Sequence, residues 1–337
     1  MDFTMLITAF GGGLLAAAIG GVPSFVFTGL TVLAAVFGGE AGAPMVGFIS
    51  FGSFFGPHVA FGGAVAAATY AKSKNLLDDG QDIVTPLFKT GDAGVLIVGG
   101  VFGIIGYLIN YILGGVLGGF IVGALPNGVW HDPAIGFGQG WVDSVAMTVF
   151  ISGILARLIF TKSGITGKYT GTEKRQYFPT GKRLTFLIVV GLGIGIAIGG
   201  VAASLGMTAL GETAAAPFAL ALFKNIGVIG FGIAAVSLTF LCMGLPLEGY
   251  HHVILPAGTT AMILFAATVN PFVAILGGAV MGMITSVFGE FAGMTFNSYA
   301  DSHIDPPAAT IWVWELVNFT ILMSIVAPHP QILALLG

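Results

Sequence analysis

Residues 130–134 read WHDPA, and residues 302–308 read SHIDPPA. Each phrase joins a His to an Asp-Pro pair at the edge of a long apolar run. Asp132 and Asp305 are 173 positions apart, and Asp143 and Glu315, which lie further along each copy, are 172 positions apart. This common spacing predicts that the two phrases belong to two copies of one unit.

The same spacing recurs upstream. GEAGAP at residues 39–44 matches GETAAAP at residues 211–217, so that Glu40 and Glu212 are 172 positions apart. AAAIGGV at residues 16–22 resembles IAIGGVA at residues 196–202, with a slightly larger spacing. We therefore predict a first repeat over residues 1–161, a basic linker over 162–183 and a second repeat over 184–337.

The composition indicates a membrane protein. Hydrophobic residues make up 56% of the chain and charged residues only 8%, whereas soluble domains carry about 25% charged residues. Residues 93–125 and 184–205 contain no charged side chain, and each run exceeds the roughly 20 residues that an apolar helix needs to cross a bilayer. We predict an all-α, multi-pass protein of the cell membrane, and no basic surface suggests a nucleic acid partner.

The Lys and Arg residues predict the topology. Seven of the eleven lie within residues 157–183, and three more lie within residues 72–89. Basic loops favour the cytoplasmic side, so both segments are expected there. Five spans in the first half, at 3–19, 22–37, 45–70, 93–117 and 135–160, then give an inverted second half. Residues 201–210 are too short to repeat 22–37 as a full span, so we expect a half-helix or re-entrant segment there, and four plus four parallel helices remain an alternative.

Prolines inside or beside the apolar runs predict broken helices, because proline removes a backbone donor. Such breaks occur at membrane depth where the freed backbone groups face protein or a wet cavity. Inverted repeats with broken helices are typical of secondary transporters, whose binding site lies between the repeats. This inference is an analogy at the level of the fold.

Acidic residues in the apolar runs are the candidate substrate or ion sites, since a carboxylate in hydrocarbon is retained only with a partner or a function. The matched pairs are Glu40 with Glu212, and Asp143 with Glu315, which we place about ten residues inside apolar helices. The alternative roles are a favourable position near a helix N-terminus for the first pair, and an interhelical hydrogen bond for the second.

The Asp-Pro pairs suggest helix starts, where Asp caps free N–H groups and Pro suits the first turn. This interpretation explains Asp132 and Asp305, but not the neighbouring His131 and His303, although imidazole is the side chain best suited to exchange protons at physiological pH. The alternative is a proton relay or gate formed by these four residues. His58 lies alone in an apolar run and is a further candidate for solute or ion binding.

Metal and cofactor sites are not expected. His251 and His252 have ligand chemistry, but adjacent positions point to different faces of a helix, and no HExxH or paired CxxC is present. No nucleotide-binding loop or GxSxG motif indicates an enzyme.

Three functions are compatible with these patterns. The favoured one is a secondary transporter of a small solute or cation, coupled to protons or sodium ions through the paired carboxylates. The second is an oligomeric channel for an ion or a small neutral solute. The third is a membrane-embedded metal enzyme or a partner subunit.

Overall fold

The structure is a computed structural model that describes residues 2–133 and 136–336, apart from the side chain of Glu40. All regular secondary structure in this part of the chain is helical. The longer helices are α1 (Phe3–Ile19), α2 (Gly21–Phe37), α4 (Ala60–Ser73), α5 (Ala93–Asn110), α7 (Ser144–Phe160), α8 (Gly181–Ala209), α9 (Ala216–Lys224), α10 (Ile226–Ser237), α12 (His251–Thr268), α13 (Pro271–Phe296) and α14 (Pro306–Leu316).

Short helices extend or connect these elements. The short α-helices are α3 (Ala43–Met45), α6 (Gly118–Ala124), α11 (Thr239–Cys242), α15 (Met323–Ile325) and α16 (Pro330–Leu336). The π-helical stretches are Val46–Ser50, Tyr111–Leu117 and Val317–Leu322. The 3₁₀-helices are Gly39–Gly42, Leu87–Thr90 and Gly128–Trp130.

Several helices have the length and apolar composition of membrane spans. In the described part of the chain five helices meet both conditions on their own: Ala93–Val122, Gly181–Ala209, His251–Thr268, Pro271–Phe296 and Pro306–Ile325. Two further pairs of helices meet both conditions when each pair is counted as one bent span. The chain bends by 119° between α1 and α2, and by 69° between α9 and Ile226–Cys242. These apolar helices support the class of protein that the composition predicts.

The predicted helix boundaries are correct in some places and wrong in others. α1 has the predicted bounds, and α2 starts one residue early. The predicted span 45–70 is instead broken, because Gly52, Gly56 and Pro57 lie in a non-helical segment before α4. The predicted half-helix 201–210 is also wrong, since it is the end of the 29-residue α8, and the short helices in this region are α9 and α10.

The predicted helix 135–160 begins late. Its first residue lies outside the described part of the chain, residues 136–143 are not helical, and α7 starts at Ser144. Gly138 has φ of 64°, a left-handed conformation that interrupts a right-handed helix. The glycine-rich segment before Ser144 thus leaves Asp143 at the helix start rather than deep inside a helix.

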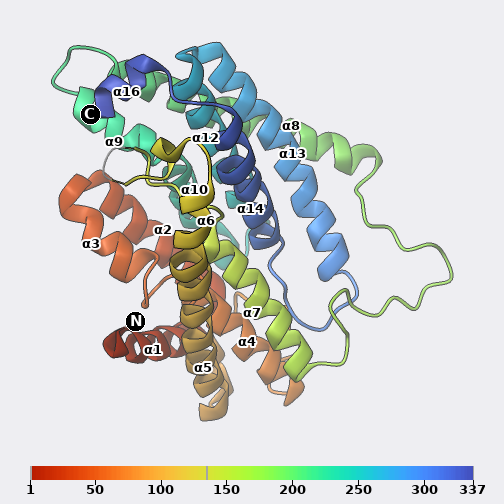
Figure 1. Cartoon of the computed structure of the whole chain (residues 1–337). Helices are drawn as coiled ribbons and strands as arrows, with labels where there is room; N and C mark the ends of the chain where they lie inside the picture. The colour runs from red at the N-terminus through yellow and green to blue at the C-terminus, as the bar shows by residue number, and fades with distance from the viewer. Residues whose placement is uncertain (1, 134–135, 337) are drawn as a thin grey trace.

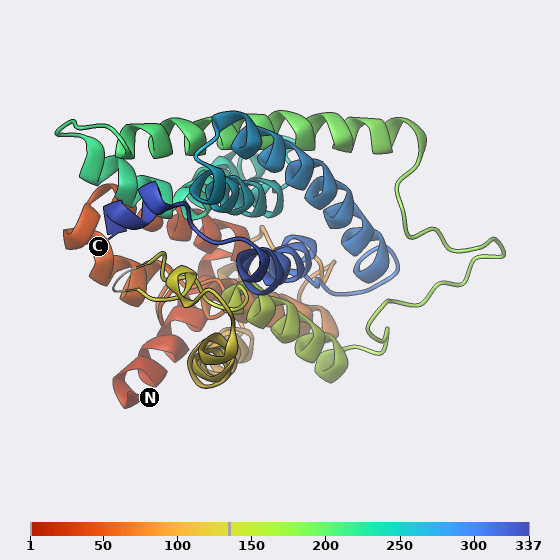
Figure 2. The same cartoon turned by 45° about the horizontal axis from the view of Figure 1, so that its top comes forward.

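The two halves of the chain use similar helix neighbours. α1 packs against α4 and α5, and α8 packs against α12 and α13. Figure 2 shows α8 along one edge of the molecule, α1 and α5 toward the opposite edge, and α7 and α14 between them. Contacts between α2 and α10 and between α7 and α14 join the halves, and the segment after α7 forms a long outer loop (Figure 1).

Glycines allow α8 and α13 to meet backbone to backbone. A Cβ on Gly195 would lie 2.2 Å from the Gly278 carbonyl oxygen, and a Cβ on Gly282 would lie 2.3 Å from that of Gly191. Such an approach is open only to residues without a Cβ atom. These glycines therefore serve helix packing.

Candidate functional site

A cavity of about 660 Å³ lies between the two halves of the chain. Helices from both halves form its wall, with α2, α4 and α7 contributing from the first half and α10, α12 and α14 from the second. Its ionisable lining residues are Asp143, Lys224, His251, His303 and Asp305. Its volume falls within the range of about 300–1,000 Å³ that is typical of small-molecule sites.

Two helices that border the cavity begin at an Asp. Asp143 is the N-cap of α7 and accepts a hydrogen bond from the Ala146 backbone N–H at 2.8 Å. Asp305 is the N-cap of α14 and accepts one from the Ala308 N–H at 2.7 Å. The capping role predicted for Asp305 and Pro306 is therefore confirmed.

The same prediction is wrong for Asp132. Asp132 and Pro133 lie outside any helix, and the capping position at the start of α7 belongs to Asp143. Asp143, and not Asp132, is thus the residue that caps a helix as Asp305 does. The sequence could not distinguish the two, because Asp132 and Asp143 both precede the apolar run of α7. Which of them caps the helix depends on the residue at which the backbone becomes helical.

α7 and α14 run in opposite directions, as Figure 1 shows. The later part of α7 lies beside the start of α14, because Gly153 meets Ile304 and Arg157 binds Ser302. The start of α7 lies near Glu315, on which the charge of Asp143 acts. Since Glu315 follows Asp305 by ten residues of helix, the two Asp caps lie at levels roughly 15 Å apart along α14.

His303 and Asp305 form one polar end of the cavity. The His303 Nε2 atom lies 3.1 Å from Asp305 Oδ1, and both residues are buried. The Asp305 carboxylate also interacts electrostatically with His251 at the start of α12. This end therefore holds one carboxylate and two imidazoles, all three of which line the cavity.

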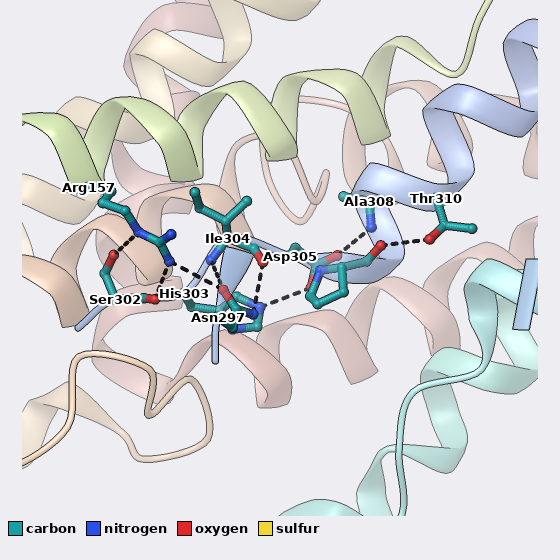
Figure 3. Close-up of polar contacts among 9 residues, drawn as sticks. Arg157, Asn297, Ser302, His303, Ile304, Asp305, Ala308 and Thr310 are labelled. Carbon is teal, nitrogen blue, oxygen red and sulfur yellow. Dashed lines mark hydrogen bonds and ion pairs between the residues drawn. The ribbon is translucent and has the colours of Figure 1, made fainter. Parts of the chain in front are cut away.

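Arg157 holds the segment that carries this cluster. Its guanidinium is fully buried and donates five hydrogen bonds, to the Ser302 hydroxyl and carbonyl, the carbonyls of Ile165 and Phe296, and Asn297 Oδ1. Asn297 in turn bonds both the N–H and the carbonyl of Ile304 at 3.0 Å. Figure 3 shows this chain of contacts leading from Arg157 to Asp305.

Asp143 and Glu315 mark the other end. Glu315 is fully buried in α14, and its Oε2 atom accepts a hydrogen bond from Asn318 Nδ2 at 3.2 Å. Thr259 lies next to Glu315 and lines the cavity, whereas Glu315 itself is not part of the lining. The structure thus brings together two acids that the sequence matched as counterparts in different repeats.

Aromatic rings cover much of the remaining wall. Phe25 contacts Phe61, Phe231 and His251, with ring centroids 5.7, 5.2 and 4.9 Å apart. Phe61 also lies at 6.1 Å from His303. An apolar or aromatic body would therefore pack well in this cavity, whereas small inorganic ions would leave most of it unused.

Two other predicted site residues, Glu212 and His58, lie outside this cavity lining. Glu212 is exposed in the turn after α8. His58 is buried before α4, and its Nδ1 has no hydrogen-bond partner among the described atoms. The prediction for Glu40 falls on a side chain outside the described part of the structure.

The segment with the WHDPA phrase packs across the halves. Trp130 is fully buried and its Nε1 donates to the Val326 carbonyl at 2.9 Å, while Asn127 Nδ2 donates to the carbonyls of Met323 and Ser324. His131 Nδ1 lies 2.9 Å from the Gln139 carbonyl oxygen. These contacts hold the segment over the last turns that follow α14, next to the cavity lining from Phe137 onward.

Within the described residues no group of three His, Cys, Asp or Glu side chains is arranged to hold a metal ion. Lys224 lines the cavity, with its Nζ 6.0 Å from the Phe137 ring centroid. Glu290, on α13, is paired with Arg183 at 2.7 Å.

Sequence reasoning missed Arg157, Asn297, Thr259 and Asn318. Arg157 carried a usable signal, because a lone Arg in the apolar run 144–160 must find buried acceptors. The other three are ordinary polar residues whose partners lie in distant parts of the chain.

Comparison with known proteins gives a family. No curated protein and no solved structure matches the chain. Residues 1–178 and 188–334 match one protein family, and the gap between the two matched ranges spans the end of the linker and the first residues of α8. Because the match covers nearly all of the sequence, the chain belongs to the family described as "Family of unknown function (DUF7973)".

Proposed function

We propose that this protein is an integral membrane protein built from two inverted repeats, and that it works as a secondary transporter. The repeats are supported by the recurring neighbours, with α1, α4 and α5 corresponding to α8, α12 and α13. The antiparallel α7 and α14, each capped by an Asp, are a further pair. The linker of residues 162–183 lies on the cytoplasmic side in this topology.

One observation carries the proposal: a cavity of about 660 Å³ lies between the halves and has a capping carboxylate at each end of the α7 and α14 pair. Transporters of inverted repeats bind their substrates at the repeat interface, beside the ends of interrupted helices. A cavity placed there is reached from either side by rocking one repeat against the other.

Hydrogen bonds between the halves lie near both ends of the cavity and would be the gates. Near Asp305, Gln81 Nε2 donates to the carbonyls of Asn297 and Ala300, at 3.0 and 2.7 Å. Near Asp143, Trp130 donates to Val326. Opening one of these two sets while the other stays closed would alternate access to the cavity.

The solute is a small organic molecule with an apolar or aromatic body and a cationic group. The phenylalanine wall favours the body, and rings also attract cations. Asp143 and Asp305 favour the positive charge, against a single Lys in the lining. Catalysis is not part of the proposal, which needs no metal or cofactor.

The test uses purified protein in proteoliposomes with an imposed pH gradient or sodium gradient, and a panel of radiolabelled aliphatic and aromatic amines. We expect at least one amine to accumulate above its outside concentration, and Asp143→Asn and Glu315→Gln each to abolish accumulation. Glu212→Gln, an exposed acid, is the matched control and should retain it. Equilibration without accumulation would indicate the channel, and absence of any flux across the panel would reject the proposal.

A further inference from the structure

Glu315 stands in a setting that an ionised carboxylate does not tolerate. The side chain has no exposed surface, and its Oε1 atom has no hydrogen-bond partner among the described atoms. Its Oε2 atom accepts a hydrogen bond from the Asn318 amide at 3.2 Å. An ionised carboxylate accepts up to about four hydrogen bonds, and a buried charge without them is strongly unfavourable.

The neighbouring polar groups have already used their protons. Asn318 Nδ2 donates to the Pro256 carbonyl at 3.3 Å as well as to Glu315, and Asn318 Oδ1 accepts from the Thr260 hydroxyl at 2.8 Å. The Thr259 hydroxyl donates its one proton to the Leu255 carbonyl at 3.1 Å. With its one proton used in this bond, the Thr259 hydroxyl can only accept a hydrogen bond from Glu315. Glu315 can donate one only when its carboxyl group is protonated.

No positive charge among the described residues compensates for Glu315. Of the elements packed against α14, α7 brings Asp143, whose charge is negative, and Arg157, which is bound to Ser302 beside the start of α14, about ten residues away from Glu315. α12 presents the uncharged Thr259 and Thr260, with its histidines about two turns away at its start. On α13, Glu290 is already paired with Arg183. In the described part of the chain only Asp143 acts on Glu315 by its charge.

We propose that the coupling ion is a proton, which Glu315 carries as a neutral carboxylic acid behind the cavity wall. As a neutral acid, Glu315 has an O–H group that can donate to the Thr259 hydroxyl oxygen. Protonation therefore explains why Glu315 Oε1 has no donor beside it. The assignment rests on the proposed function, because coupling has meaning only in a transporter.

A sodium ion fits this setting poorly. Hard cations take oxygen ligands, about six or more. The Asn318 amide presents its NH₂ group to Glu315, because its oxygen is turned to Thr260, and an NH₂ group cannot coordinate a cation. The carboxyl group therefore has a hydrogen-bond donor where a sodium site would need a ligand.

We assign the Asp143 carboxylate as the group that receives the proton, because Asp143 lines the cavity and its charge acts on Glu315. On release the Glu315 O–H bond breaks and a new O–H bond forms on the Asp143 carboxylate. The negative charge moves from Asp143 to Glu315 in this exchange, so the total charge of the pair is unchanged. A cationic solute beside Asp143 would oppose protonation of Asp143, which links solute binding to the proton.

The test is infrared difference spectroscopy of the full chain in lipid at neutral pH, without solute. We expect the carbonyl stretch of a protonated carboxylic acid in the native protein, its loss in Glu315→Gln, and its retention in Glu212→Gln. Labelling with ¹³C-glutamate in the native protein should shift the same band, which assigns it to Glu even if the Glu315 variant fails to fold.

A band that is absent, or that survives Glu315→Gln, would overturn the assignment, as would a band that appears only after sodium is removed. Because the spectrum requires neither flux nor solute, the proton can be present while the amine panel shows no transport. The transporter can likewise be active without this band, so the two proposals fail separately.

Discussion

At the scale of single residues, Arg157 has the largest set of buried contacts in the site. A guanidinium with five N–H donors fits five acceptors, and here they come from the linker, α13, and the segment before α14. Such a group links regions of the chain that no local propensity connects. Its role is to position His303 and Asp305 rather than to bind solute.

Replacing Arg157 by Met should destabilise the protein by several kcal/mol, because at least two buried carbonyls lose their donor at about 1–3 kcal/mol each. The measurement is unfolding of detergent-solubilised protein followed by tryptophan fluorescence. Lys162→Met, which removes an exposed charge nearby, should have little effect. Equal stability of the two variants would show that the Arg157 network is unimportant for folding.

At the scale of elements, the start of α7 separates two roles of Asp143. The side chain caps the helix, and its charge faces the cavity and Glu315. Asn caps nearly as well as Asp, whereas Ala does not cap. The two substitutions therefore distinguish a structural contribution from an electrostatic one.

We expect Asp143→Asn to retain the stability of the native protein and Asp143→Ala to lose about 1 kcal/mol. Both should abolish amine accumulation, because both remove the carboxylate. Thermal unfolding and uptake are measured on the same preparations. Retained accumulation in Asp143→Asn would mean that the cap, and not the charge, is what the transporter needs.

The contact between α8 and α13 gives a second prediction at this scale. Gly195→Ala places a methyl group 2.2 Å from the Gly278 carbonyl oxygen, so the helices must separate, at a cost of about 1–3 kcal/mol. Gly193→Ala, on the same helix with nothing within 4 Å, should be neutral or stabilising, by up to about 1 kcal/mol. The comparison uses denaturant titrations in one detergent, and equal midpoints would contradict close packing at Gly195.

At the scale of the whole molecule, the proposed topology places the two ends of the cavity on opposite sides of the membrane. The exposed Cys242 is the only cysteine, so Cys242→Ser gives a background for labelling. In that background Glu173→Cys reports the linker and Gly128→Cys reports the segment before α7, and both positions are exposed.

A membrane-impermeant maleimide should label Glu173→Cys only from the cytoplasmic side and Gly128→Cys only from the opposite side. The reason is that basic segments are retained inside, and α7 lies between the two positions. Labelling is followed in intact cells and in inside-out vesicles. Reaction of both positions from one side would reject the proposed topology and, with it, alternation between the two gates.

Much of the fold was predictable because helix formation in an apolar chain depends on local composition. The bounds of α1, the cap at Asp305 with Pro306, and the long charge-free spans follow from the sequence. The late start of α7 did not, because its glycines allow several backbone paths and the choice depends on contacts such as that of Trp130 with Val326. Of the candidate site, Asp143, Glu315, His303 and Asp305 were identified from the sequence, while Arg157, Thr259 and Asn318 were not.

The sequence by itself determined an all-helical chain with apolar helices of spanning length, the basic linker, and the acids that stand in apolar surroundings. These features depend on hydropathy and on residues a few positions apart, which a sequence displays directly. Only the tertiary structure decided that Asp143 caps α7, that it lies near Glu315, and that Arg157 reaches across to Ser302. The last two of these join residues more than 140 positions apart, and they exist because the packing of the two halves brings buried polar groups of one half beside those of the other.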